Sequence, residues 1–207
     1  MSDTQIQIRG EPFSNVKCKF IVDRPVYDGR SHYFANAQQA DGSPLATALF
    51  AIEGVSNVLI SHNEITVGKA TMIEWPVIGK QVGGAIRAHL ESGAPAVGDS
   101  LRAALPPETE IRAKVERVLA EEVNPWVGQH GGVVRLVDVR ENTVFLQMGG
   151  GCQGCGSATA TLRLGVETAI RASVPAVGDI RDVTDHAAGR NPYYAPQAGQ
   201  AQPQPQA

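Results

Sequence analysis

The chain has 207 residues, a formal net charge of -3 and a pI near 5.9, so it offers no broad attraction to phosphate backbones and we expect no nucleic-acid partner. Its 43% hydrophobic residues can build cores, but no uninterrupted apolar run reaches membrane-spanning length, so we expect no membrane partner. Residues 1–5 lack the basic region and apolar core of a secretion signal, which favours the cytoplasm. A chain of this length favours two modest domains over one.

The first half of the chain mixes strand and helix signals. The run from Val16 to Val22 predicts a strand, in which we interpret Cys18 as a small buried residue. The pattern then predicts, in chain order, a short helix opening near Ser43-Pro44, strands at 55–60 and 64–67 with Asn63 in the turn between them, and a helix over 74–89. We therefore interpret residues 10–91 as one small α+β domain.

Glycine and proline mark the next interval, which runs from Ser92-Gly93 to Pro106-Pro107. Such residues punctuate regular structure, so residues 92–107 are predicted to be a linker.

The second half predicts a second α+β domain over residues 108–186, with the element order helix, strand, strand, helix, strand. Ile111, Val115, Val118 and Leu119 recur on one helical face, and Pro125 is expected to end that helix. Residues 133–139 and 143–148 are predicted to form an antiparallel hairpin around Glu141-Asn142. A helix capped by Ser157 is predicted to follow, with an apolar stripe at Leu162, Val166, Ala169 and Ile170. The last predicted element is a strand at 179–183. Residues 187–207 are rich in Gln, Pro, Ala and Gly and are expected to be disordered.

The chemistry of the chain is concentrated at Cys152-Gln153-Gly154-Cys155, which lies between the predicted strand and the predicted helix. A helix N-terminus favours thiolate over thiol, so both sulfurs are suited to ligate a metal. All-thiolate zinc sites and iron–sulfur clusters need four sulfurs, and no second CxxC is present. One chain thus supplies half of such a site, and sharing it between two chains is the economical solution. The surrounding glycines, Gly149, Gly150, Gly151, Gly154 and Gly156, remove side chains that could obstruct a second subunit.

Two other uses of the CxxC stay open at this stage. A thioredoxin-like dithiol has the same spacing but belongs to a βαβ context, whereas here a hairpin precedes the helix. A structural zinc site would need further ligands, and His130 or His186 does not form the usual close pair with another histidine. We do not assign His130 as a ligand; His32, His62 and His89 are interpreted as surface or capping residues, and Met148 as core.

The second half of the chain closely resembles the NifU-like C-terminal domain of iron–sulfur carrier proteins. The resemblance is carried by Asn124-Pro125, His130-Gly131-Gly132, Gly149-Gly150-Gly151-Cys152-Gln153-Gly154-Cys155 and Gly165-Val166-Glu167. Upstream, Ser43-Pro44-Leu45-Ala46, Ile52-Glu53-Gly54-Val55 and Ile65-Thr66-Val67 resemble the Nfu N-terminal domain that is joined to it.

The resemblance implies a homodimer that binds one [4Fe-4S] cluster through Cys152 and Cys155 of each chain and is not an enzyme. It implies that the cluster is received from upstream assembly proteins and delivered to apo iron–sulfur recipient proteins, with the N-terminal domain helping to dock recipients. A thiol–disulfide or zinc-binding interaction module is the alternative.

Overall fold

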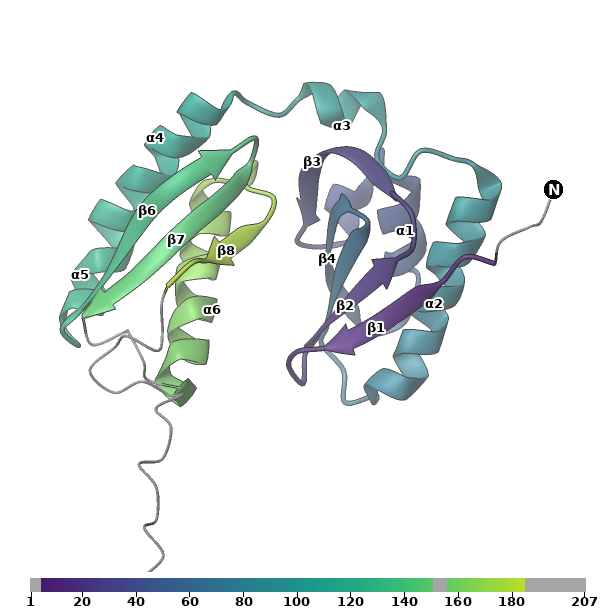
Figure 1. The fold of residues 1–207 in the computed structure, drawn as a ribbon, viewed down its shortest axis with the longest axis horizontal. Coiled ribbons are helices and arrows are strands. Elements are labelled where there is room, and N and C mark those ends of the chain that lie inside the picture. The colour runs from purple at the N-terminus through teal and green to yellow at the C-terminus, as the bar shows by residue number, and fades with distance from the viewer. Residues whose placement is uncertain (1–4, 151–155, 185–207) are drawn as a thin grey trace, which may run out of the picture.

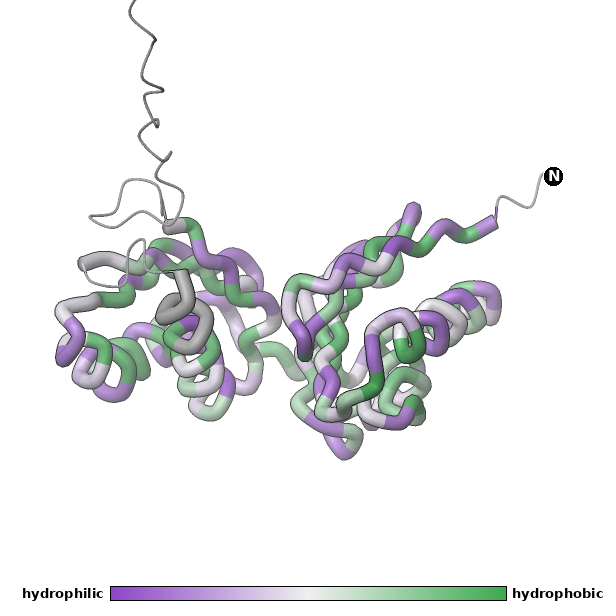
Figure 2. Tube along the Cα trace, turned by 90° about the horizontal axis from the view of Figure 1, so that it is seen from below, coloured by the Kyte–Doolittle hydropathy of each residue, from purple (hydrophilic) through white to green (hydrophobic). Residues whose placement is uncertain are grey.

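The computed structural model describes residues 5–150 and 156–184, and only the backbone of residues 156–161. Two sheets, each with its own helices and its own buried core, confirm an α+β fold with two domains (Figure 1). Hydrophobic and hydrophilic residues alternate along the strands and helices of both (Figure 2). The predicted disordered tail at 187–207 lies outside the described residues.

The first domain is built on a five-stranded antiparallel sheet in the order β1-β2-β5-β4-β3. Its elements are β1 (Ile8–Pro12), β2 (Lys17–Val22), β3 (Tyr27–Phe34), the short 3₁₀ helix η1 (Ala37–Ala40), α1 (Pro44–Phe50), β4 (Val55–His62), β5 (Glu64–Lys69) and α2 (Trp75–Ser92). The helix at Ser43-Pro44 is confirmed, because the Ser43 hydroxyl accepts the Ala46 N–H at 3.2 Å and caps α1. The predicted strands β2, β4 and β5 and helix α2 are confirmed, whereas β1 and β3 were not predicted.

One face of this sheet packs against α1 and α2, and the other face looks toward the second domain (Figure 1). The helix-facing side carries Cys18, Phe20, Ile60, Ile65 and Val67, all buried. The opposite side is more polar and carries Lys17 and Lys19. This division fixes which side chains of the first domain can reach the second.

The interval predicted as a linker contains a short helix, α3 (Asp99–Ala103). Ala96 and Val97, which precede it, are buried in the core of the first domain. The start of the interval is therefore packed rather than extended. The boundaries predicted for the two domains and the linker stay predictions.

The second domain begins with one long helical stretch: α4 (Glu108–Val118), a π-helical turn η2 (Leu119–Val123) and α5 (Asn124–Gly128). The prediction that Pro125 ends the helix is wrong, because the helical backbone continues to Gly128. The π turn gives the physical reason. Asn124 N–H bonds to the carbonyl of Leu119, five residues back, and this wider turn accommodates a proline that cannot donate.

The rest of the second domain is β6 (Gly132–Arg140), β7 (Thr143–Gly150), α6 (Gly156–Ser173) and β8 (Ile180–Asp182). β6 and β7 form the predicted antiparallel hairpin, and β8 joins β7 in parallel. Glu141 occupies the left-handed region with φ 58°, as expected of a tight hairpin turn. The predicted apolar face of α4 is buried, as are Val166, Ile170 and Met148, so the predicted core and element order are confirmed.

Of the three histidines interpreted as surface or capping residues, two are not on the surface. His32 and His89 are buried, at 7% and 8% exposure, whereas His62 is exposed as predicted. Burial lowers the pKa of His32 from 6.5 to about 4, and the nearby charges of Arg102 and Arg30 add to that effect. Burial also lowers the pKa of His89, which lies in the last turn of α2.

Among the described helices, none combines the length and apolar character needed to cross a bilayer.

Candidate functional site

The structure describes both ends of the connection that carries the CxxC. β7 delivers the chain at Gly150, and α6 takes it up again at Gly156. Cys152, Cys155, Gly151 and Gly154 lie between these ends, outside the described residues, so their role as ligands and their access stay predictions. α6 begins one residue before the predicted cap Ser157, which places Ser157 in the first turn of the helix.

At the strand end that leads to the cysteines, Gly149 and Gly150 of β7 lie very close to the neighbouring backbone and side chains. Gly150 pairs with Gly132, and a Cβ at Gly150 would run into the carbonyl oxygen of Gly131. Gly150 also has φ +62°, a conformation that disfavours any residue with a Cβ. At Gly149, a Cβ would lie 3.1 Å from Val133 Cγ1. Packing within the chain therefore explains glycine at positions 149 and 150, in addition to the predicted access for a second subunit.

Asn124 fixes the helical stretch to the same end of the hairpin. Its side-chain amide donates to the carbonyl of Val134 at 3.0 Å, and its side-chain oxygen accepts the Val134 N–H at 2.8 Å. The side chain thus pairs with β6 as a neighbouring strand would. Sequence reasoning included Asn124 in a motif but missed this function, and its only signal was an asparagine beside a proline within a helical pattern.

Trp126, two residues on, lies against Gly165 of α6, where a Cβ would come within 3.3 Å of the indole ring. Helix α5 is therefore held to strand β6 by Asn124 and to the middle of helix α6 by Trp126.

The start of α6 is electrostatically suited to anionic sulfur. Its first turn contains no acidic residue, so no carboxylate of that turn competes for the unpaired N–H groups and the positive end of the helix dipole. The donor set that the sequence places there, two thiols per chain, fits a thiolate-ligated metal centre.

Other candidate ligands lie elsewhere. Cys18 is 2% exposed in β2, and burial raises the pKa of its thiol to about 11, so it is a neutral core group as predicted. His130 is exposed, and its backbone N–H donates to Val127 and helps to end α5. Across residues 5–150 and 156–184, no three His, Cys, Asp or Glu side chains gather as a metal site would require.

Among the described residues, side chains of the first domain bond to the second domain at two places. At the first place, the side-chain amide of buried Asn142, in the β6–β7 turn, donates to the carbonyl of Ser31 in β3 at 2.6 Å. Gly178 lies against the same serine, where a Cβ would come within 2.6 Å of the Ser31 hydroxyl. This contact brings the edge strand β3 against the hairpin turn.

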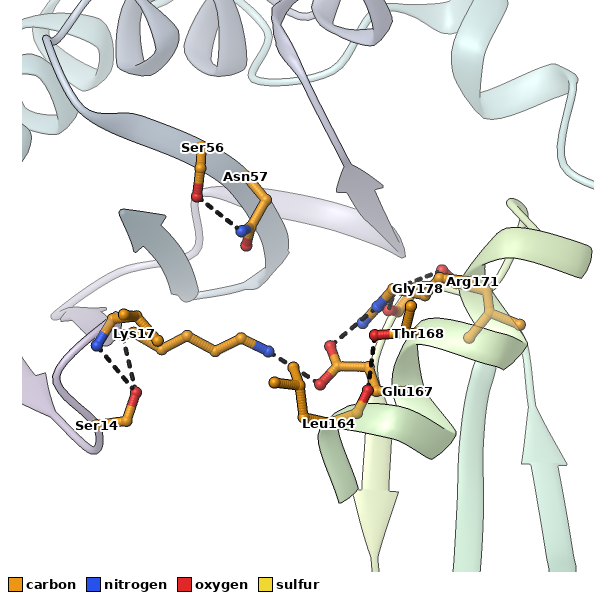
Figure 3. Close-up of polar contacts among 11 residues, drawn as sticks. Ser14, Lys17, Ser56, Asn57, Leu164, Glu167, Thr168, Arg171 and Gly178 are labelled. Carbon is orange, nitrogen blue, oxygen red and sulfur yellow. Dashed lines mark hydrogen bonds and ion pairs between the residues drawn. The ribbon is translucent and has the colours of Figure 1, made fainter. Parts of the chain in front are cut away.

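The second place is an ion-pair cluster centred on Glu167 of α6, shown in Figure 3. Lys17 Nζ reaches from β2 to one carboxylate oxygen at 2.9 Å, and Arg171 Nε bonds the other at 3.0 Å. Arg171 also donates to the carbonyls of Val177 and Gly178, and its guanidinium lies 3.7 Å from the ring centre of Tyr33 in β3. We call Lys17, Glu167, Arg171 and Tyr33 the interdomain latch.

The latch keeps Glu167 ionised. Burial would raise the pKa of this carboxyl group, but the charges and hydrogen bonds of Arg171 and Lys17 outweigh burial and hold the pKa below 4.5.

Both contacts lie away from the ends of the cysteine connection. Glu167 follows the start of α6 by eleven residues, roughly 16 Å along a helix axis. Asn142 precedes β7, whose far end at Gly150 is about 24 Å along the strand. Neither of these two contacts therefore reaches Gly150 or Gly156, the described residues between which the CxxC lies.

Comparison with known proteins agrees with this architecture. Residues 115–181 match the family model of the NifU-like domain, and residues 6–93 match that of the scaffold protein Nfu/NifU N terminal, so together they cover roughly three quarters of the chain. The chain is a NifU-like protein with an Nfu N-terminal domain. Its two matched segments correspond to the two sheets described above.

Relatives of this NifU-like protein are similar over one or both domains. The Fe/S biogenesis protein NfuA of Pseudomonas savastanoi pv. phaseolicola is 43% identical over 91 residues, covering 42% of this chain and 46% of the relative. The NFU1 iron-sulfur cluster scaffold homolog, mitochondrial, of Drosophila sechellia is 31% identical over 163 residues, covering 77% of this chain and 58% of the relative. The chain thus spans about half the length of the relatives it matches. A NifU-like protein of Saccharomyces cerevisiae has a solved structure whose alignment covers 48% of this chain and 90% of the yeast chain, at 20% identity and a TM-score of 0.43.

Proposed function

We propose that this protein is an iron–sulfur cluster carrier. In this proposal, Cys152 and Cys155 of each chain of a homodimer bind one [4Fe-4S] cluster, received from upstream assembly proteins and passed to apo iron–sulfur proteins in the cytoplasm. The observation that carries the proposal is a CxxC placed between β7 and α6 in a chain that combines these two domains. Relatives that are similar to one or both of these domains are named for Fe/S biogenesis and as an iron-sulfur cluster scaffold homolog.

The number of sulfurs argues for the dimer. A cluster ligated only by cysteine needs four thiolates, and each CxxC provides two. The positions of the interdomain contacts support this arrangement, because the bonds at Glu167 and Asn142 lie away from Gly150 and Gly156. The acid-free start of α6 supports thiolates on both chains.

Cargo that is bound between two chains is suited to release, so we assign transfer rather than catalysis. In transfer, each carrier thiolate on an iron atom is exchanged for a thiolate of the recipient. The exchange requires no net oxidation or reduction. We therefore propose that the protein is not an enzyme.

Anaerobic reconstitution of the full chain with iron and sulfide tests the ligation. We expect one cubane cluster per dimer, with the Mössbauer signature of four-iron clusters, and we expect Cys152→Ala and Cys155→Ala to abolish it. Cys18→Ala is the matched control: it removes a cysteine of the first domain that is buried at 2% exposure and should leave cluster content unchanged. A loaded monomer, or a full cluster in either loop variant, would contradict the proposal.

The same samples separate the alternatives. Bound zinc without sulfide would favour the zinc module, and disulfide turnover by metal-free protein would favour the dithiol. Transfer is then measured by activation of an apo-enzyme that requires a [4Fe-4S] cluster. Activation in the presence of an iron chelator, faster than with free iron and sulfide, is the expected result.

A further inference from the structure

A groove of about 470 Å³ runs between strand β1 and helix α2 of the first domain, on the side of the sheet that faces away from the second domain. Its lining includes Phe20 and Cys18, which are buried, and Trp75. Gly10 of β1 forms part of one wall. We call this cavity the β1–α2 groove. It lies apart from the cysteine connection, which belongs to the other domain.

The groove is open because α2 presents glycine where a core-facing helix normally carries larger residues. A Cβ at Gly83 or Gly84 would meet no atom within 4 Å, and one at Gly79 would make only ordinary contact with Phe20. None of the three has a positive φ. Glycine is a poor helix former, so the fold itself would be better served by alanine at Gly83 and Gly84. The effect of the three glycines in this structure is to leave the α2 side of the groove without side chains at these positions, and Gly79 is the one of the three that borders Phe20.

The groove also carries uncompensated positive charge. Its described lining includes Lys80 and Arg87 but no carboxylate, although the whole chain is acidic at net -3. Within the described part of the chain, Lys80 has no ion pair or hydrogen bond. Arg87 donates one N–H to the carbonyl of Ile6 at 3.3 Å, while its buried Nε has no partner among the described residues. A buried donor without a partner is costly, and an acidic group in the groove would satisfy it.

The rim of the groove is an edge strand. β1 pairs only with β2 in the described sheet, so its other edge is available to an extended segment. Pro12 shortens that edge, because it has no N–H to donate.

We propose that the β1–α2 groove docks an acidic segment of a partner protein, which places an apolar side chain over Phe20 and a carboxylate at Lys80 and Arg87. Charge complementarity favours a partner over the chain's own residues 185–207, which contain a single acidic residue, Asp185. If the proposed function holds, the partner could be a recipient, but binding in the groove requires no cluster.

Fluorescence anisotropy with the full chain tests the proposal. The probe is a labelled eight-residue peptide of alternating leucine and glutamate; matched probes replace glutamate with lysine, or leucine with serine. We expect saturable binding of the leucine–glutamate peptide, weakened by salt, and much weaker binding of both matched probes.

Two variants locate the binding. Gly83→Leu fills the groove where a Cβ meets nothing within 4 Å, and should weaken binding by about tenfold or more. Lys80→Glu reverses an exposed charge, and should weaken it by about fivefold or more. Ala88→Leu, an exposed position of α2 outside the groove lining, and Arg135→Glu, an exposed position of β6, are the matched controls and should bind as the unmodified chain does.

Several results would overturn the proposal. Absence of saturable binding at millimolar protein, equal binding of the leucine–lysine peptide, or unchanged binding by Gly83→Leu would each do so. Tighter binding after removal of residues 185–207 would identify the tail as the occupant, and loss of dimer in Gly83→Leu would identify a second copy. Cluster content of Gly83→Leu is measured alongside, so that failure of docking and failure of cluster binding are distinguishable.

Discussion

Removing either half of the Lys17–Glu167 ion pair should weaken the coupling between the two domains. Both side chains are largely buried, at 23% and 25% exposure, so their contribution should exceed that of a fully exposed pair. We expect Lys17→Met, which keeps most of the aliphatic stem, to lower the free energy of unfolding by about 1 kcal/mol. Glu167→Gln should cost about 2 kcal/mol, because Arg171, at 10% exposure, loses its carboxylate partner but keeps two backbone carbonyls.

A double-mutant cycle isolates the interdomain pair. The double mutant should lose about 1 kcal/mol less stability than the sum of the two single mutants, because the second substitution removes a side chain whose partner is already gone. Urea unfolding can follow each domain separately, because Trp75 lies in the first domain, Trp126 in the second, and the chain has no other tryptophan. Trp126→Phe and Trp75→Phe backgrounds therefore report one domain each. Simple additivity within about 0.3 kcal/mol would refute the latch.

The latch should also respond to acid and salt. The folded pKa of Glu167 lies below 4.5, so its contribution is fully present above that pH and is lost as the pH falls through the folded pKa. The Glu167→Gln variant should lack this component of the acid response. Coupling that is unchanged by high salt would contradict a partly exposed ion pair.

Three further predictions concern named positions. Gly150→Ala should destabilise the second domain by about 2 kcal/mol or more in urea unfolding, because φ is +62° and the Gly131 carbonyl blocks a Cβ; an effect within error would refute this account. Asn124→Ala should cost about 2 kcal/mol by losing both bonds to Val134, and Asn124→Asp, which can still accept but not donate, should show an intermediate loss at neutral pH. The pKa of His32 falls from 6.5 to about 4 on folding, so the unfolded chain takes up a proton at a higher pH than the folded chain does. As the pH falls from 6.5 to about 4, the free energy of unfolding of the first domain should therefore decrease by up to about 3 kcal/mol. His32→Phe should flatten that pH profile.

The elements that sequence predicted are those with strong local periodicity. β2, α2, α4 and the β6–β7 hairpin carry clear apolar patterns, and their buried faces match them. β1 and β3 were missed for physical reasons. β1 is a short edge strand with Gly10 and Pro12 and almost no buried face, and β3 has a register shift between Tyr27 and His32 that breaks its alternation.

Other features depend on tertiary contacts that no local pattern contains. The burial of His32 results from stacking on Phe34 and an edge contact with Tyr27 within the folded sheet. Lys17 and Glu167 are 150 residues apart in the chain. The CxxC, by contrast, was found from sequence because its chemistry depends on residue type and spacing. The two hydrogen bonds between Asn124 and Val134 could be recognised only from the folded structure.

The arrangement of the two domains separates the two proposed binding regions. The sheet of the first domain lies between the β1–α2 groove and the second domain (Figure 1). The latch contacts α6 well beyond its first turns, and the contact at Asn142 lies at the opposite end of the hairpin from Gly150. A partner in the groove would therefore not cover the end where the cysteine connection begins, and a second copy at that end would not cover the groove. Docking and cluster binding should consequently be separable by mutation: Gly83→Leu should retain the cluster, and Cys152→Ala should retain the acidic peptide.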